Sequence, residues 1–464
     1  MLSVTPTRRP LLDPDFLPAS LWNRAYQKQV EESAQSEEVV LSLERRDGSR
    51  SQFRTRTLPH TGEAVSLNQT YIERLVKFLL WQRGGFRLCV AGNPALAAYL
   101  RAVYAPSGAR AFDFDFMGQT VYGHDFQVES IAVSQLPPEA ETTLSLGRHM
   151  DGCRIGFDLG GSDRKCAAVI DGKLVHSEEI TWDPYFQKNP RYHFEGIMDS
   201  LRRAAEKLPR VDAIGGSSAG VYVGNEVRVA SLFRGVSPED FDAHVRRMFF
   251  DVKKEWGNVP FDVANDGEVT ALAGSMSLGD GAVLGISMGT SQAGGYVTPQ
   301  GTITNWLNEL AFAPIDYAPR AHVDEWSRDG GVGAQYFSQQ AVGRLVEPAG
   351  IDLPQEMPLP EKLLAVQELM AKGDARARSI YTTIGVYFGY AIAHYADFYE
   401  IRHLLLLGRV LSGEGGDLII ETAREVLAEE FPEIAERVQV HTPGEAEKRH
   451  GQAVAAASLP EIPS

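Results

Sequence analysis

Cysteine is scarce in this chain, and long apolar runs are missing. Its 464 residues include three cysteines, Cys89, Cys153 and Cys166, which are too few and too scattered for a disulfide framework or a cysteine-rich metal site. No run approaches the roughly 18 to 20 apolar residues that a membrane helix requires, and the N-terminus, M-L-S-V-T-P-T-R-R-P, lacks the apolar core of a signal peptide. These absences predict a cytoplasmic protein that has no membrane partner.

Positive charge is also in short supply. The chain has 45 Lys and Arg against 61 Asp and Glu, for a formal net charge of −16. Residues 1–150 carry 16 of each sign, so the net negative charge lies entirely after residue 150. Because proteins bind the phosphate backbone through basic surfaces, this balance predicts that nucleic acid is not a partner.

The length suits two or three domains, each able to bury a core of its own. Prolines and an acidic run predict that residues 1–40 form an extended arm. The polar stretch Leu136–Arg148 predicts a linker, which leaves residues 41–150 as an N-terminal α/β or α+β domain of unknown role. There, the alternation F-D-F-D-F predicts a strand with Asp113 and Asp115 on a solvated face, with a metal or substrate site as the alternative.

After residue 150, predicted strands and helices alternate, which indicates an α/β architecture. Cys153–Val169 and Lys173–Ile180 predict a three-stranded meander, and Pro238–Trp256 predicts one amphipathic helix. Later segments repeat this kind of pattern up to a closing helix at Gly444–Ala457. Two open halves, each built of strands and helices, are therefore expected.

A glycine turn between two predicted strands is the most informative motif. Residues Ile155–Val169 read I-G-F-D-L-G-G-S-D-R-K-C-A-A-V, with Asp158 at the end of the first strand and Gly160, Gly161 and Ser162 after it. Glycines let backbone N–H groups approach phosphate oxygens, and a carboxylate can hold hydrated Mg²⁺. The same pattern also fits a plain β-hairpin with a Gly-Gly turn.

A second segment of this kind begins about 130 residues later, at Val283–Val297, where Gly289, Thr290 and Ser291 occupy the predicted turn. Between the two segments, V-A-N-D-G-E ends a predicted strand in Asn265 and Asp266. Ligands of open α/β sheets bind at such strand ends, so Asp266 is a candidate general base. The alternative is that Asn265 or Asp266 only caps the helix that follows.

The order of these motifs, followed by L-L-L-L-G-R-V-L-S-G at Leu404–Gly413, resembles the ROK (repressor, open reading frame, kinase) family of the sugar kinase, heat-shock chaperone and actin superfamily. The resemblance covers Gly152 to Leu459. It implies two ribonuclease H-like domains of the actin-like ATPase type around a cleft. The first would span residues 151–263 together with the C-terminal helix 444–459, and the second would span residues 264–443.

The resemblance also implies a site and a reaction. Asp266 would act as general base in the ATP-dependent phosphorylation of a sugar hydroxyl, while Asn265 and Glu309 would bind the sugar. Mg²⁺ would be held through water by Asp158. The residues implied in ATP binding are Asp158, Gly160, Gly161, Ser162, Lys165, Gly289, Thr290, Ser291 and Gly408. For Lys165, a solvated position near a strand edge is the alternative. A homodimer is also expected.

Several positions depart from the family pattern. Phe312 stands where the family has a histidine, and Ser327–Tyr336 contains none of the cysteines that bind its structural zinc, so no zinc is expected. Asp163 and Glu268 replace residues without negative charge near the implied triphosphate, and Arg409 replaces a glycine of the adenosine motif. Arg164, Lys165 and Arg409 would offset part of the added negative charge.

Two other functions remain open at this stage. The same family contains carbohydrate-sensing transcription regulators that do not catalyse a reaction, but these carry a basic N-terminal helix-turn-helix, and residues 1–150 are charge-neutral here. An ATPase or acyl-phosphate kinase of the same superfamily is the third possibility. ADP release in the presence of a sugar, DNA retention, or ATP hydrolysis without an acceptor would separate the three.

Overall fold

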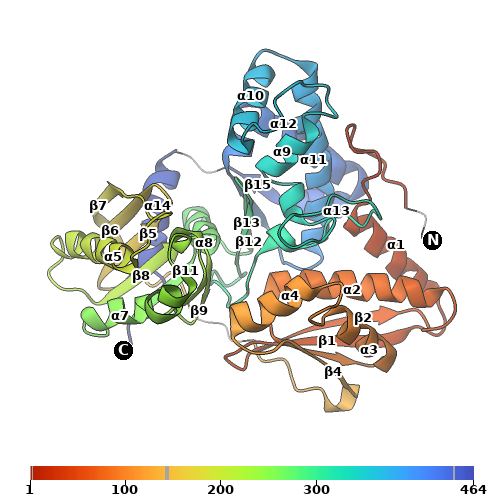
Figure 1. Cartoon of the computed structure of the whole chain (residues 1–464), viewed down its shortest axis with the longest axis horizontal. Helices are drawn as coiled ribbons and strands as arrows, with labels where there is room; N and C mark the ends of the chain where they lie inside the picture. The colour runs from red at the N-terminus through yellow and green to blue at the C-terminus, as the bar shows by residue number, and fades with distance from the viewer. Residues whose placement is uncertain (1, 3, 142–145, 443–444, 464) are drawn as a thin grey trace.

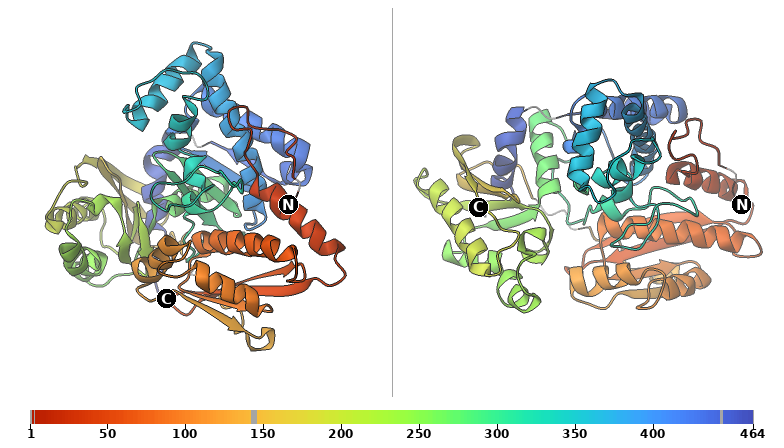
Figure 2. Two further views of the ribbon diagram at one scale, coloured as in Figure 1. Left: turned by 45° about the vertical axis from the view of Figure 1, so that its right-hand side comes forward. Right: turned by 45° about the horizontal axis from the view of Figure 1, so that its top comes forward.

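The computed structural model describes residues 2, 4–141, 146–442 and 445–463, and the side chains of 445–450 are left aside. The chain forms an N-terminal domain and two lobes (Figure 1). The N-terminal domain lies directly beside the second lobe in each view of Figure 2, and the first lobe projects to one side. Among the described residues, no helix is long and apolar enough to cross a membrane. Part of the expected linker, residues 142–145, and Gly444 of the expected closing helix lie outside the described residues.

The N-terminal domain is a four-stranded sheet, in the order β2-β1-β3-β4, covered by helices. Strands β1, β2 and β3 are antiparallel neighbours, and β4 is parallel to β3. Its elements are α1 (Ala19–Glu32), β1 (Glu37–Glu44), β2 (Arg50–Thr57), α2 (Ala64–Arg83), β3 (Arg87–Ala91), α3 (Pro94–Val103), α4 (Ala111–Asp115), η1 (Phe116–Tyr122), β4 (Gln127–Ile131) and η2 (Val133–Gln135).

The prediction that residues 1–40 form an extended arm was wrong, because α1 occupies 14 of them and β1 begins at Glu37. Besides the turn at 33–36, the irregular residues are 2 and 4–18, which precede α1. They lie against the second lobe, where the Tyr387 hydroxyl donates to Asp13 at 2.7 Å and Phe16 is buried in the shared core. Prolines break helices but do not exclude one that starts after them, and α1 begins directly after Pro18.

The F-D-F-D-F segment is helical rather than a strand, so that prediction was also wrong. Phe112 and Phe116 are four residues apart and share one helix face, where both rings pack on Trp81 with centroids 6.1 and 5.0 Å away. Asp113 is buried instead of solvated, and it accepts hydrogen bonds from Lys77 Nζ at 2.8 Å and Trp81 Nε1 at 2.7 Å. An alternation of only five residues fits the two-residue period of a strand as well as the period of a helix. The ion pair between Asp113 and the buried Lys77 favours the helix here.

The first lobe contains a five-stranded sheet in the order β11-β8-β5-β6-β7. Strands β5, β6 and β7 form the predicted antiparallel meander, while β5, β8 and β11 are parallel. Its elements are β5 (Cys153–Leu159), β6 (Asp163–Ile170), β7 (Lys173–Thr181), α5 (Pro190–Ala205), β8 (Ala213–Ser218), β9 (Val221–Val223), β10 (Glu226–Val229), η3 (Ser231–Phe233), α6 (Pro238–Asp240), η4 (Phe241–Val245), α7 (Met248–Glu255) and β11 (Phe261–Asn265).

The single helix predicted at Pro238–Trp256 is interrupted. A wide turn replaces regular α-helix in its middle, where the Arg246 N–H bonds to the Phe241 carbonyl at 2.9 Å, and α7 starts afresh at Met248. Val245 and Phe249 are nevertheless both buried in the core of the first lobe. The apolar pattern therefore identified the buried face correctly but not the break.

The second lobe has a four-stranded sheet in the order β13-β12-β14-β15. Strands β12, β14 and β15 are parallel, and β13 is antiparallel to β12. Its elements are α8 (Asp266–Leu278), β12 (Val283–Met288), β13 (Gln292–Val297), η5 (Leu310–Phe312), η6 (Gly333–Gln335), α9 (Gln339–Leu345), α10 (Leu359–Ala371), α11 (Ala375–Ala396), β14 (His403–Leu407), η7 (Arg409–Leu411), α12 (Glu414–Glu430), α13 (Pro432–Arg437) and β15 (Gln439–His441).

The closing helix α14 (Glu445–Ala457) returns to the first lobe and packs on β5 and β8. Glycines make this close approach possible. A Cβ on Gly156 would lie 1.7 Å from the Ala453 carbonyl oxygen, and one on Gly215 would lie 1.8 Å from that of Ala456. These two glycines lie within strands rather than turns, and their lack of a side chain lets a helix backbone contact the sheet.

Candidate functional site

The strand-end residues gather where the parallel strands of each lobe stop. In the first lobe, β5, β8 and β11 end at Leu159, Ser218 and Asn265, and in the second lobe β12 and β14 end at Met288 and Leu407. The glycine turns and Asp266 follow these ends directly. Parallel strands place their carboxyl ends at one edge of their sheet, so the motifs of each lobe lie at the edge of its own sheet where ligands of such folds bind.

The first glycine turn joins β5 to β6. The Gly160 N–H donates to the Asp163 carbonyl at 2.9 Å, and Trp182 Nε1 donates to the Gly160 carbonyl at 2.8 Å. A Cβ on Gly161 would lie 1.9 Å from the Tyr185 hydroxyl, so a larger residue there would have to displace the Tyr185 ring. The Ser162 hydroxyl donates to the Asp163 carboxylate at 2.9 Å.

Asp158 and Lys165 face each other across β5 and β6, where they are register partners. Lys165 Nζ lies 3.8 Å from Asp158 and 3.5 Å from Asp163, so this lysine reaches over the turn instead of standing in solvent at a sheet edge, and β6 is an inner strand. Burial raises the pKa of Asp158 to about 6, against the hydrogen bond from Ser217 and the charge of Lys165. Asp158 is therefore ionised at neutral pH.

The second turn, between β12 and β13, is tight and open to solvent. The Gly289 N–H donates to the Ser291 carbonyl at 3.0 Å, and Thr290 and Ser291 are exposed. Gly408, at the end of β14, has φ +105°, and a Cβ there would lie 2.3 Å from the Met288 carbonyl oxygen. The end of β14 thus lies against the start of the second turn, and the two segments form one surface.

Asn265 caps helix α8, which decides between the two capping alternatives. Its Oδ1 accepts from the Gly267 N–H at 2.8 Å, and its Nδ2 donates to the Gly220 carbonyl at 2.7 Å. The Glu268 carboxyl in turn accepts from the Asn265 backbone N–H, which completes a capping box. The Asp266 carboxylate also accepts from the Gly267 N–H, at 2.9 Å.

Three carboxyl groups, those of Asp266, Glu268 and Glu309, lie close enough to influence each other. Burial raises the pKa of Asp266. Burial, and then the negative charge of Asp266, raise the pKa of Glu309 to about 7. Burial raises the pKa of Glu268 to about 8. The hydrogen bond from Asn308 lowers this pKa, and the negative charge of Glu309 raises it further. At neutral pH Glu268 is mostly protonated, so its side chain adds little negative charge near the proposed triphosphate site.

Glu309 is held by the N-terminal domain. Its backbone N–H donates to the Trp81 carbonyl at 2.9 Å, and the N–H of Asn308 donates to the Gln82 carbonyl at 2.9 Å, both at the end of α2. The Asn308 side chain joins Glu268 and Tyr399 through hydrogen bonds of 3.2 and 2.9 Å. Sequence reasoning placed Asn308 beside Glu309 in the N-E-L segment and Trp81 in a helix but gave neither residue a role, because their partners are distant in the chain.

A cavity of about 460 Å³ lies beside Asn265 and Glu268. Its walls come from the β9–β10 hairpin, the free edge of β11, the segment 304–307 and the N-terminal domain, which contributes Tyr122 and residues 45–47. Asn225 covers part of the β11 edge, where its amide bonds both the Val263 N–H and the Phe261 carbonyl, at 2.8 and 3.0 Å. Among the described residues, no group of three or more His, Cys, Asp or Glu is arranged to hold a metal ion.

A comparison with models of known protein families matched none of them, and a search of the curated proteins found no match. Solved structures do match. A ROK hexokinase from Thermus thermophilus has a TM-score of 0.52 at 17% identity, and the match covers 66% of this chain and 96% of that one. A ROK family transcriptional regulator, a homolog of the E. coli MLC protein, has a TM-score of 0.50 at 17% identity over 67% of this chain and 79% of that one. Residues 151–442 and 445–463 thus form two α/β lobes, and about two thirds of the chain has the fold of the ROK proteins.

Proposed function

We propose that this protein is an ATP-dependent kinase that phosphorylates a hydroxyl of a sugar or sugar derivative, with Asp266 as the general base. The observation that carries the proposal is the convergence of Asp266, Glu309 and Asn265 at the end of β11. Burial raises the pKa of Asp266, which makes its carboxylate a stronger base for a hydroxyl proton. The hexokinase fold of the structural match supports the same reaction class.

Each lobe would hold one side of the nucleotide. Gly161 and Ser162 would offer backbone N–H groups to phosphate oxygens, and Gly160, whose own N–H is bonded to the Asp163 carbonyl, would let the phosphate approach the turn closely. Gly289, Thr290, Ser291 and Gly408 would line the opposite surface. Lys165, already above the turn, would contact phosphate and offset the charge of Asp163. Asp158, ionised at neutral pH, is suited to hold hydrated Mg²⁺ through water, and that ion would supply charge stabilisation for phosphoryl transfer.

In this scheme, Asn265 and Glu309 orient the sugar and Asp266 takes the proton of the attacking hydroxyl. Asn265 is held by its bonds to Gly267 and Gly220, so its position is set before substrate binds. The test is ADP release from Mg-ATP with a panel of hexoses and hexose derivatives. Asp266→Asn should abolish it while circular dichroism and gel filtration remain those of the wild type. An absence of ADP release with every sugar would refute the proposal.

A sugar sensor without catalysis is the second candidate, favoured by the match to a ROK regulator and by the negative charge of Asp163, whose carboxylate accepts from the Ser162 hydroxyl in the first turn and would repel a phosphate there. The N-terminal domain carries a four-stranded sheet and a charge balance of zero, unlike a basic helix-turn-helix. Calorimetric sugar binding without ADP release would favour the sensor. Retention of DNA fragments at physiological salt would add a regulatory role.

A further inference from the structure

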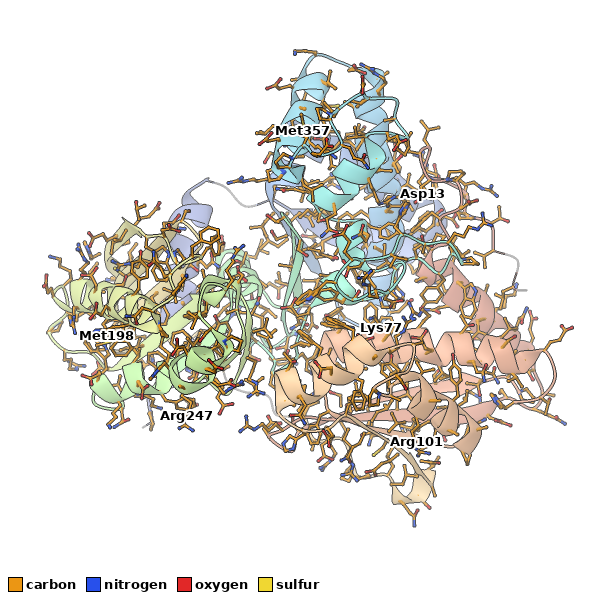
Figure 3. The ribbon with its side chains drawn as sticks, in the orientation of Figure 1. Asp13, Lys77, Arg101, Met198, Arg247 and Met357 are labelled. Atoms are coloured by element: carbon orange, nitrogen blue, oxygen red, sulfur yellow. The ribbon has the colours of Figure 1, made fainter. Side chains whose placement is uncertain are left out.

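Six charged side chains meet where helix α2 contacts the second lobe. Figure 3 labels Lys77 at this boundary. The cations are Arg74, Lys77 and Arg110, and the anions are Glu73, Asp113 and Asp329. Their side chains are at most 16% exposed. All of them except Asp329 belong to the N-terminal domain.

Asp329 completes the charge balance of this cluster. It lies 2.6 Å from Arg110, 3.2 Å from Arg74 and 3.3 Å from Lys77. Without it, the N-terminal domain would bury three cations against two anions, and an unpaired buried charge is strongly destabilising. The buried cations of the N-terminal domain therefore require Asp329 of the second lobe as a partner, and the ion cluster joins the two parts of the protein.

The same helix continues from the ion cluster to Glu309. Arg74, Lys77 and Trp81 are spaced by three and four residues and share one face of α2. The carbonyls of Trp81 and Gln82, in the last turn of α2, accept the N–H groups of Glu309 and Asn308. One rigid helix thus connects the charges around Asp329 to the backbone of the residue expected to bind the sugar.

The chain on the other side of Glu309 is tied to Asp329 as well. The Gly333 N–H donates to the Ala313 carbonyl at 3.1 Å, and the Ile315 N–H donates to the Gly331 carbonyl at 2.8 Å. Phe312 packs on Trp81 with ring centroids 4.5 Å apart. The two ends of the segment 308–333 are therefore joined by backbone hydrogen bonds, and both contact α2. The first end does so through the hydrogen bonds of Asn308 and Glu309, and the second through the ion pairs of Asp329.

We propose that α2 is a positioning element for Glu309, locked by the pairing of Asp329 with Arg74, Lys77 and Arg110, so that the N-terminal domain is an integral part of the sugar site. This inference rests on the proposed kinase function for the role of Glu309. Asp329 lies within Ser327–Tyr336, the segment in which no zinc ligands were expected, and its ion pairs anchor that segment to the N-terminal domain.

The first test compares Asp329→Asn with Glu433→Gln. The control removes another carboxylate at a contact between the N-terminal domain and the second lobe, since Glu433 accepts from Arg24 of α1 at 3.0 Å, but it lies outside both α2 and the segment 308–333. Asp329→Asn should raise the KM for the sugar by about tenfold or more and leave the KM for ATP within about twofold. The control should change neither constant, and Asp329→Glu should restore most of the sugar affinity. A wild-type sugar KM in folded Asp329→Asn would overturn the inference.

The second test does not depend on catalysis. Hydrogen exchange should be about tenfold faster or more at the amides of Asn308 and Glu309 in Asp329→Asn, because the bonds to α2 open more often. If Asp329→Asn does not fold, Lys77→Met is used instead, because it removes a cation of the cluster and keeps most of the side-chain length. The same amides should then exchange faster. Unchanged exchange would refute the anchoring. If the wild type phosphorylates no sugar, the proposed function is refuted. Hydrogen exchange at Asn308 and Glu309 would still test whether Asp329 holds them against α2.

Discussion

Glu268→Gln should change how the stability of the protein depends on pH. The Glu268 side chain is 7% exposed and accepts from Asn308 and from the Asn265 backbone. Its pKa is raised from 4.5 to about 8 in the folded protein. A carboxyl whose pKa is higher in the fold than in the unfolded chain stabilises the fold fully below pH 4.5, and this stabilisation is lost as the pH rises through about 8.

The magnitude follows from the shift. Each pKa unit corresponds to about 1.36 kcal/mol, so the whole effect is roughly 4 to 5 kcal/mol, and the part that falls between pH 5.5 and 8.5 is about 3 kcal/mol. Glutamine cannot ionise, and its amide oxygen can take the place of the carboxyl oxygen that accepts from Asn308. The free energy of unfolding of the variant, relative to that of the wild type, should therefore rise by about 3 kcal/mol between pH 5.5 and pH 8.5.

Urea unfolding of both proteins at pH 5.5, 7 and 8.5 measures this difference. Coupling with Glu309, whose pKa is also raised, broadens the transition but does not change its sign. Glu255→Gln, at an exposed position in α7, is the control and should show a difference that does not vary with pH. A difference for Glu268→Gln that stays constant within about 0.5 kcal/mol would refute the reasoning, because Glu268 would then titrate alike in the folded and unfolded chains.

Further outcomes are expected. Gly156→Ala should lower the free energy of unfolding by about 3 kcal/mol in urea melts, because its Cβ would overlap the Ala453 carbonyl of α14. Asn265→Ala should cost about 1 kcal/mol through the lost helix cap, measured in the same way. In kinase assays between pH 6 and 8, the sugar KM should fall as the pH rises through about 7, where Glu309 ionises and becomes a stronger acceptor. Over the same range, kcat should not decrease, since the base Asp266 must be ionised; a loss of rate with rising pH would contradict its role.

Part of the candidate site could be predicted from the sequence. The turns at Gly160 and Gly289 were predicted from glycine and hydroxyl spacing, and each follows the end of its strand in the fold. Asp266 was weighed against a helix cap, and the fold gives the cap to Asn265. Local patterns succeed here because backbone conformation at a turn or strand end is set by a few consecutive residues. The roles of these residues in catalysis stay predictions until activity is measured.

The sequence by itself determined the α/β architecture, the meander of β5 to β7, and the order of the strand-end motifs. Only the tertiary structure decided which charges are buried and with what they pair. Asp113 became the partner of Lys77 instead of a solvated strand residue, and the Glu309 N–H donates to the Trp81 carbonyl of α2, more than 200 residues earlier in the chain. Periodicity and spacing describe neighbours along the chain, whereas charge state and anchoring depend on desolvation and on partners that folding brings together.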